Sequence, residues 1–160
     1  MISRSIIFSL LLIITGSATA DELHLIVSGK AIHFSNAKYN EKNTGLGFEY
    51  DFEERNNWIP LITGASFKDS NNQTSNYLGG GTKRRFRFSN DPKGFHIDAG
   101  IFAFLMTRYD YKNNDPFIAA LPFASLGFEW FSINVTYVPK MKPKMVAFVY
   151  FQATVKLLEF

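Results

Sequence analysis

The sequence predicts an all-β fold, an eight-stranded antiparallel transmembrane β-barrel. Apolar and polar residues alternate along much of the chain, which is the period of a β-strand. Aromatic residues make up 16% of the chain, with 17 phenylalanines, and there are no cysteines. A closed sheet pairs every backbone group inside a membrane, and its aromatic residues gather at both interfaces. This combination favours a barrel of the outer-membrane type.

The chain begins with the features of a secretory signal peptide, predicted over residues 1–20. Arg4 gives a positive start, Ile6 to Ile14 is almost entirely apolar, and Ala18-Thr19-Ala20 is a small-x-small cleavage site. The alternative, a transmembrane anchor, would need about twenty apolar residues, and this stretch is shorter. We therefore expect residues 21–160 to form a single outer-membrane barrel domain.

Eight segments are predicted as strands, and most have about the ten residues that a tilted membrane strand needs. The second segment alternates most clearly, with Leu46, Phe48, Tyr50 and Phe52 on one face. Alternation also fits a soluble exported β-sandwich, in which the apolar face would be the core. The predicted segments are 22–33, 45–53, 58–67, 75–88, 95–107, 117–128, 131–138 and 145–157.

The links between these segments differ in length from one side of the barrel to the other. The second, fourth and sixth links are short, whereas the odd-numbered links are generally longer and more polar. Short periplasmic turns and longer outer loops are expected of such barrels. His33 ends the first segment and Asp69-Ser70 follow the third, so both are expected at the same outer rim.

The residues at this rim could support acyl chemistry. Ser70 could act as a nucleophile or polarise a carbonyl if His33 removes a proton, with Asp69 as electrostatic support. The plainer interpretation is that Asp69-Ser70 is a loop turn and His33 an interfacial polar residue. His24 and His96 start their strands on the opposite side. We expect no cofactor and no metal site, because the histidines are dispersed and the acids lack recognised ligand spacing.

Several short motifs, in order along most of the chain, resemble the PagP family, the lipid A palmitoyltransferases of outer membranes. The most specific are Phe67-Lys68-Asp69-Ser70 and Leu121-Pro122-Phe123-Ala124-Ser125-Leu126-Gly127. The others are Tyr39-Asn40-Glu41, Gly45-x-Gly47, Gly79-x-Gly81, Thr136-Tyr137-Val138-Pro139 and Val149-Tyr150-Phe151.

The resemblance implies an acyltransferase that moves a palmitoyl chain from the sn-1 position of a phospholipid to lipid A. Its catalytic His, Asp and Ser carry over to His33, Asp69 and Ser70. The family measures acyl length in an interior pocket with a glycine at its floor, which matches Gly81.

The resemblance also implies a substrate-binding role for three further residues. Tyr39 lies in a matching motif, and Pro122 and Pro139 match family prolines that weaken strand pairing and admit lipid sideways. Proline cannot donate to the hydrogen-bond ladder, which is the physical reason for such an opening. We expect the protein to be a monomer in the outer membrane, with no nucleic acid partner.

The chain departs from the family pattern near its first loop. The family's amphipathic N-terminal helix is missing, and the spacing from His33 to Tyr39 is shorter. Lys42-Asn43-Thr44 stands where a proline is expected after Tyr-Asn-Glu. The family resemblance also implies a lateral opening for lipid between the first two strands, and these differences concern the residues that would form it.

Two alternatives remain at the level of sequence. His33-Phe34-Ser35 is similar to the His-x-Ser motif of the PagL lipid A 3-O-deacylases, with Ser35 as nucleophile, His33 as base and Glu49 as a possible orienting acid. That family carries its motif near the C-terminal end, however. The other alternative is a small structural or adhesive barrel, which predicts that His33 lies far from Asp69 and Ser70.

Overall fold

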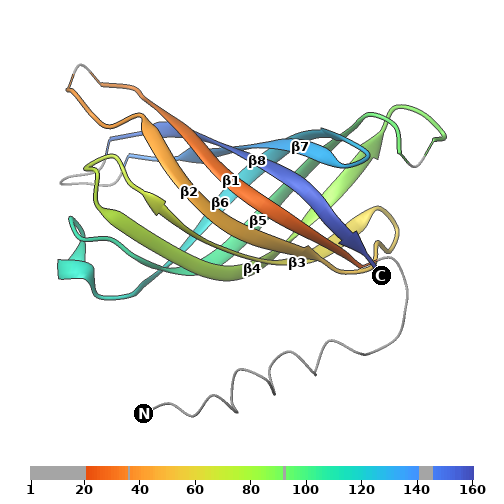
Figure 1. The fold of residues 1–160 in the computed structure, drawn as a ribbon, viewed down its shortest axis with the longest axis horizontal. Helices are drawn as coiled ribbons and strands as arrows, with labels where there is room; N and C mark the ends of the chain where they lie inside the picture. Colours follow the sequence, from red (N-terminus) through yellow and green to blue (C-terminus); the bar gives the residue numbers. More distant parts are fainter. Residues whose placement is uncertain (1–20, 36, 92, 141–145) are drawn as a thin grey trace, which may run out of the picture.

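The computed structural model describes residues 21–35, 37–91, 93–140 and 146–160. Within them, eight antiparallel strands follow one another in chain order and close into one barrel (Figure 1). The strands are β1 (Glu22–His33), β2 (Lys42–Asp51), β3 (Trp58–Lys68), β4 (Thr74–Arg87), β5 (His96–Thr107), β6 (Phe117–Phe128), β7 (Phe131–Val138) and β8 (Phe148–Glu159). One short 3₁₀-helix, Lys112–Asn114, lies between β5 and β6. None of the helices among the described residues is long and apolar enough to cross a membrane.

The predicted fold class is confirmed, and most strand boundaries agree closely with the prediction. The largest differences are at β2, which begins at Lys42 rather than at residue 45, and at β8, which runs from Phe148 to Glu159. The polar start of β2 is held in the sheet by Asn43, whose Nδ2 donates to the Lys68 carbonyl at 2.8 Å. The predicted signal peptide, residues 1–20, lies outside the described residues.

The barrel is apolar on the outside and encloses buried charged side chains, which settles the ambiguity of the alternating pattern. Leu46, Ile101 and Ile118 are exposed by 61%, 54% and 79%, whereas Glu49 and Lys83 are buried. A soluble sandwich would bury the apolar face instead. The exposed aliphatic and aromatic band suits contact with lipid chains, as in outer-membrane barrels.

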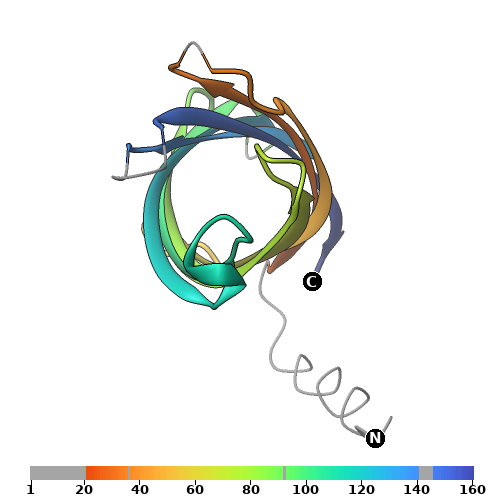
Figure 2. The same cartoon turned by 90° about the vertical axis from the view of Figure 1, so that its left-hand side faces the viewer.

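The two ends of the barrel differ (Figure 1). One end, called here the loop mouth, carries the links 34–41, 69–73, 108–116 and 139–147. The other, the terminal mouth, carries the links 52–57, 88–95 and 129–130, together with Asp21 and Phe160. Figure 2 views the closed ring of strands from the loop mouth. The links at the loop mouth are longer on the whole, but the predicted difference is incomplete, because the link 88–95 at the terminal mouth is longer than the link 69–73.

A β-bulge in β1 changes which residues of this strand face the lumen. Its register against both β2 and β8 shifts between Ser28 and Lys30. Before the shift, Ser28 is buried and Val27 exposed; after it, Ala31 is buried and Ile32 exposed. One extra residue at Gly29 thus reverses the alternation. Consequently His33 faces inward at the loop mouth.

Strands β6 and β7 separate towards the loop mouth. Their pairing runs from Phe128↔Phe131 to Phe123↔Thr136 and stops there. The first half of β6 pairs with β5, and the end of β7 pairs with β8. Pro122 and Pro139 flank the point of separation, which leaves a gap in the hydrogen-bond ladder on one side of the barrel.

Candidate active site

His33 and Ser70 meet at the loop mouth. The His33 Nε2 atom lies 2.8 Å from the Ser70 Oγ atom, a hydrogen bond between residues that are far apart in sequence. With a neutral imidazole protonated on Nδ1, the Ser70 hydroxyl donates and Nε2 accepts. This is the geometry in which a histidine removes the proton of a serine nucleophile. His33 Nδ1 is buried and has no hydrogen-bond partner among the described residues.

Two aromatic rings hold the imidazole in place. Tyr39 stacks on it with ring centroids 4.4 Å apart and an interplanar angle of 21°, and Phe148 lies against it at 5.0 Å. Tyr39 comes from the link between β1 and β2, and Phe148 begins β8. The short spacing from His33 to Tyr39 therefore folds the loop back over the histidine that precedes it.

Asp69 supports the Ser70 loop from below and does not face His33. Its Oδ1 accepts hydrogen bonds from the backbone N–H groups of Asn71 at 2.9 Å and Gln73 at 3.0 Å. Its Oδ2 accepts from the Ser75 hydroxyl at 3.0 Å, and the side chain is 1% exposed. These bonds form a turn in which the carboxylate replaces a backbone acceptor. This geometry suits a role in which Asp69 positions Ser70.

Asn40 ties the first loop to the third. Its backbone N–H donates to the Ser70 carbonyl at 2.9 Å, and its Nδ2 donates to the Asp69 carbonyl at 3.1 Å. The loops that carry His33 and Ser70 are thereby fixed relative to each other. Two independent hydrogen bonds resist separation of the pair better than the His33–Ser70 contact alone.

A buried arginine lies beside the pair. Arg108 is 5% exposed and forms a two-pronged ion pair with Asp110, with both nitrogen–oxygen distances at 3.0 Å. Burial alone would raise the pKa of Asp110, but the hydrogen bonds and charge of Arg108 hold this pKa below its ordinary value. Asn71 Nδ2 donates to Asp110 at 2.7 Å, which links the arginine to the residue after Ser70.

An apolar cavity of about 230 Å³ extends from Ser70 into the barrel. Aromatic and aliphatic side chains line most of it, including Phe67, Phe104 and Phe117. Arg108 and Ser70 contribute polar atoms to its lining. On one side the lining includes Leu121 of β6 and Pro139 after β7, where the two strands separate. The cavity therefore adjoins a lateral gap that faces the membrane.

Aromatic and polar side chains close the inner end of the cavity. Tyr77, Phe102 and Gln152 line both the cavity and a much smaller space beneath it, of about 10 Å³. Gln152 Nε2 donates to the Tyr77 hydroxyl at 3.3 Å. These three residues form the aromatic floor, the name used below for this boundary.

The predicted substrate-binding residues lie at different places. Tyr39 contacts His33, and Pro122 and Pro139 flank the lateral gap. Gly81 faces the lumen below the cavity, but the lining does not include it. A Cβ at Gly81 would lie 2.2 Å from the Ile101 carbonyl oxygen, so its missing side chain gives room to β5. Its role in acyl binding stays a prediction.

Sequence reasoning missed Asn40, Arg108 and Asp110. Asn40 lies in a motif that the sequence analysis noted, yet nothing in the motif shows its hydrogen bonds across loops. The pair Arg108-x-Asp110 has spacing that allows a local ion pair at a strand end, which is the only signal the sequence offers for it.

The residues of the alternative hydrolase do not assemble in the same way. Ser35 is exposed, and its Oγ accepts a hydrogen bond from the Ala37 N–H at 3.2 Å. Glu49 pairs with Lys83 and aligns with His24 across β1 and β2, well below the loop mouth. Glu49 is therefore placed too far along the barrel to orient His33.

Comparison with known proteins adds a family match. The sequence model described as "Antimicrobial peptide resistance and lipid A acylation protein PagP" matches residues 29–152. The match includes His33, Asp69, Ser70 and every strand that lines the cavity.

Several curated relatives carry the description "Lipid A acyltransferase PagP". Those of Erwinia sp. (strain Ejp617) and Klebsiella pneumoniae are 36% and 35% identical over 103 residues, which is 64% of this chain in both cases. The alignments cover 54% and 53% of those proteins, so the chain spans about half the length of the curated relatives it matches.

Among solved structures, the Yersinia pestis outer membrane protein Ail in a phospholipid bilayer nanodisc is similar in fold. It is 12% identical in sequence, with a TM-score of 0.51, and the superposition covers 88% of this chain and 100% of Ail. At this identity the likeness concerns the barrel alone.

Proposed function

Because the chain belongs to the PagP family of lipid A acylation proteins, we propose that it is an outer-membrane acyltransferase that moves a palmitoyl chain from a phospholipid to lipid A. The carrying observation is the 2.8 Å contact between His33 Nε2 and Ser70 Oγ beside an apolar cavity. A reactive pair next to a space for a hydrocarbon chain is what acyl transfer between lipids requires. The family and the barrel fold support an outer-membrane location.

The proposed reaction has two balanced steps. Ser70 Oγ attacks the sn-1 ester carbonyl of the phospholipid while His33 Nε2 takes its proton; the ester C–O bond breaks, and the proton passes to the departing lysophospholipid oxygen. A lipid A hydroxyl then attacks the acyl-Ser70 ester, again with His33 as base. The serine oxygen recovers the proton as the acyl chain leaves. Asp69 holds the loop that aims Ser70.

The donor chain is proposed to enter through the lateral gap between β6 and β7. The apolar cavity can hold a long donor chain without exposing its methylene groups to water, and each exposed methylene group would cost about 0.8 kcal/mol. Arg108, which lines the cavity beside Ser70, is suited to the phosphate of a lipid headgroup. The Pro122 and Pro139 positions support entry at this side.

The experiment is mass spectrometry of lipid A from cells that lack their own enzyme of this type and express wild type, Ser70→Ala or His33→Ala. Wild type is expected to add the mass of one palmitoyl chain, and each variant to lose at least about 100-fold of this product, since the pair acts as a unit. Heat-dependent gel migration establishes that each barrel is folded.

Ser35→Ala is the matched control, because it removes the serine that the alternative deacylase would use and should leave acylation unchanged. Purified protein given phospholipid labelled at either sn-1 or sn-2 then identifies the donor chain. A folded wild type that adds no acyl chain would sink the proposal. Loss of a hydroxyacyl chain that depends on Ser35 would identify a deacylase instead.

A further inference from the structure

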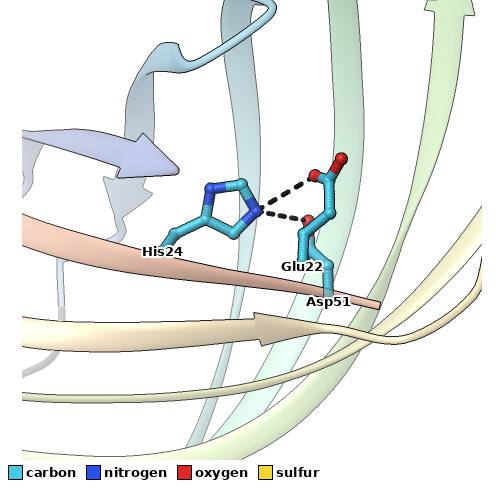
Figure 3. A group of neighbouring side chains, drawn as sticks. All are labelled: Glu22, His24 and Asp51. Atoms are coloured by element: carbon cyan, nitrogen blue, oxygen red, sulfur yellow. Dashed lines mark ion pairs between the residues drawn. The ribbon is translucent and has the colours of Figure 1, made fainter. Parts of the chain in front are cut away.

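Three potential metal ligands meet inside the terminal mouth, at the opposite end from the acyl-transfer site. They are Glu22 and His24 of β1 and Asp51 of β2 (Figure 3). Glu22 and His24 are two residues apart and so lie on the same face of β1. Asp51 is the direct cross-strand partner of Glu22. The strand register therefore brings together ligands that are widely spaced in sequence, which is why sequence reasoning predicted no metal site.

The distances fit coordination by one ion. His24 Nε2 lies 3.2 Å from Glu22 Oε2 and 3.4 Å from Asp51 Oδ2, and the three ligand atoms lie within 4.8 Å of one another. Around a tetrahedral Zn²⁺ with bonds of about 2.0–2.1 Å, neighbouring ligand atoms are roughly 3.3 Å apart. Figure 3 shows the Glu22 and Asp51 carboxylates both paired with the same imidazole nitrogen, His24 Nε2.

The ligand atoms also lack hydrogen bonds. His24 Nε2 and both carboxylate oxygens of Asp51 are buried and have no hydrogen-bond partner among the described residues. The Asp51 side chain is only 2% exposed, so water cannot solvate it freely. His24 Nε2 and Asp51 Oδ2 nevertheless lie in an ion pair with each other at 3.4 Å, and Lys83 Nζ lies 2.6 Å from Asp51 Oδ2. Asp51 Oδ1 is therefore the buried atom for which a metal ion would supply a missing partner.

Neighbouring cations orient the two carboxylates without filling the site. Lys156 Nζ binds Glu22 Oε1 at 2.9 Å, which leaves Oε2 towards His24. Lys83 Nζ lies 2.6 Å from Asp51 Oδ2 and also binds Glu49 at 2.8 Å. Such outer contacts commonly fix metal ligands.

The charges at this mouth leave room for a further cation. Four carboxylates, those of Glu22, Glu49, Asp51 and Asp98, lie among three basic side chains, those of Lys83, Arg85 and Lys156. Lys156 is shared with a fifth carboxylate, Glu159, at 3.0 Å. Counting Glu159, five carboxylates face three basic side chains, and His24 adds a fourth cation when it is protonated, so the carboxylates outnumber the cations by one even then.

There is also space for a fourth ligand. A cavity of about 20 Å³ adjoins the cluster and is lined by Glu22, His24 and Trp130. A space of this size holds about one water molecule. It gives a place for the water that completes a tetrahedron.

We propose that Glu22, His24 and Asp51 bind one Zn²⁺, with water as the fourth ligand. The ion joins the first residues of β1 to the last residue of β2. It thereby fastens the start of the chain's first strand, next to the β1–β8 seam where the barrel closes. Zinc binding is independent of acyl transfer, because its ligands lie at the other mouth.

The test is zinc titration by calorimetry of protein purified in detergent without a histidine tag and stripped with a chelator. Wild type is expected to bind one Zn²⁺ per chain, and Co²⁺ should give the intense visible absorption of a tetrahedral site. His24→Gln and Glu22→Gln should weaken binding by more than about 100-fold, the upper range for loss of an outer-sphere partner.

His96→Gln is the matched control. His96 is a second inward-facing histidine at the same mouth, 10% exposed, with Nδ1 near the Gly94 carbonyl at 3.3 Å. This variant should bind zinc as wild type does. Heat-dependent migration identifies folded variants, and Glu22→Gln replaces His24→Gln if the latter does not fold. The proposal is overturned if the folded wild type binds no zinc in the titration, or if the His24 or Glu22 variant binds zinc as tightly as wild type. In that case a protonated His24 bridges the two carboxylates by ion pairs alone.

Discussion

At the scale of single residues, the Ser70 corner is a turn and also the proposed reactive site. The carboxylate of Asp69 organises the turn through Asn71, Gln73 and Ser75, and this turn presents the Ser70 hydroxyl to His33. The turn and the proposed reactive site are therefore parts of the same structure, residues 69–75 together with His33. The hydrogen bonds that Asp69 accepts within this turn orient the Ser70 hydroxyl.

This assignment predicts different outcomes for two substitutions of Asp69. Asp69→Ala leaves two backbone N–H groups and a hydroxyl without their acceptor, at a cost of about 1–3 kcal/mol for an unsatisfied group. We expect acylation to fall at least about tenfold in kcat with little change in KM. Asp69→Asn keeps the Oδ1 acceptor and should restore most of the activity.

Steady-state acyl transfer by the purified variants measures this difference, and denaturant unfolding reports the stability. Equal loss in Asp69→Asn and Asp69→Ala, with both barrels folded, would show that the negative charge itself is needed. That outcome would contradict a positioning role.

The sequence could predict the partners at this site but not their orientation. Strand counting placed His33 and Ser70 on one rim, because successive strands alternate in direction. The direction of the Asp69 carboxylate depends on the backbone path of residues 69–75, and a sequence pattern does not determine that path. Arg108 was missed for a similar reason, since its burial depends on three loops.

At the scale of elements, the bulge in β1 decides where His33 points. In an unbroken strand, His33 would have the opposite parity to Ser28 and would face lipid. The extra residue at Gly29, a few residues before β1 ends, turns the His33 side chain to the lumen instead. The sequence predicted the bounds of β1 correctly but gave no indication of the bulge. A bulge is defined by the register of β1 against its neighbouring strands, which the sequence of β1 alone does not determine.

Deleting Gly29 should therefore abolish acylation, because the deletion moves the His33 side chain to the lipid face. Gly29→Ala is the control: an added Cβ would meet only the Phe151 carbonyl oxygen, at an ordinary 3.5 Å. We expect near-normal lipid A acylation by the alanine variant and none by the deletion, with both proteins showing the gel migration of a folded barrel. Acylation by a folded deletion variant would mean that the bulge does not determine which way the His33 side chain points.

At the scale of the whole molecule, the lumen is divided into two halves. An apolar cavity lies towards the loop mouth, and a network of buried charges lies towards the terminal mouth, with the aromatic floor between them. The sequence predicted the barrel and its polar interior from alternation. It could not predict this division, because the inward residues of each half come from all eight strands.

The aromatic floor sets the depth of the cavity, so removing a ring should change the acyl chain that is selected. Phe102→Ala should shift the transferred chain towards longer lengths, measured from the mass of acylated lipid A. Phe102 is half-buried, so its loss should cost less than the about 3–5 kcal/mol of a fully buried phenylalanine, and gel migration checks that the variant folds.

Ile101→Ala is the matched control, because Ile101 is adjacent on β5 and faces outward with 54% exposure. It should leave chain length unchanged. If a folded Phe102→Ala protein transfers a chain of unchanged length, the aromatic floor does not limit acyl-chain length. Gly81 would then be the next residue to substitute.

The divided lumen also has a consequence for the membrane around the protein. Below the aromatic floor, Lys83 and Arg85 span the interior in ion pairs with Glu49, Asp51 and Asp98, and the spaces between them measure about 10 and 20 Å³. Such gaps are too small for a hydrated ion or a sugar to pass. Cells could therefore carry many copies of this barrel without losing the permeability barrier that their envelope maintains.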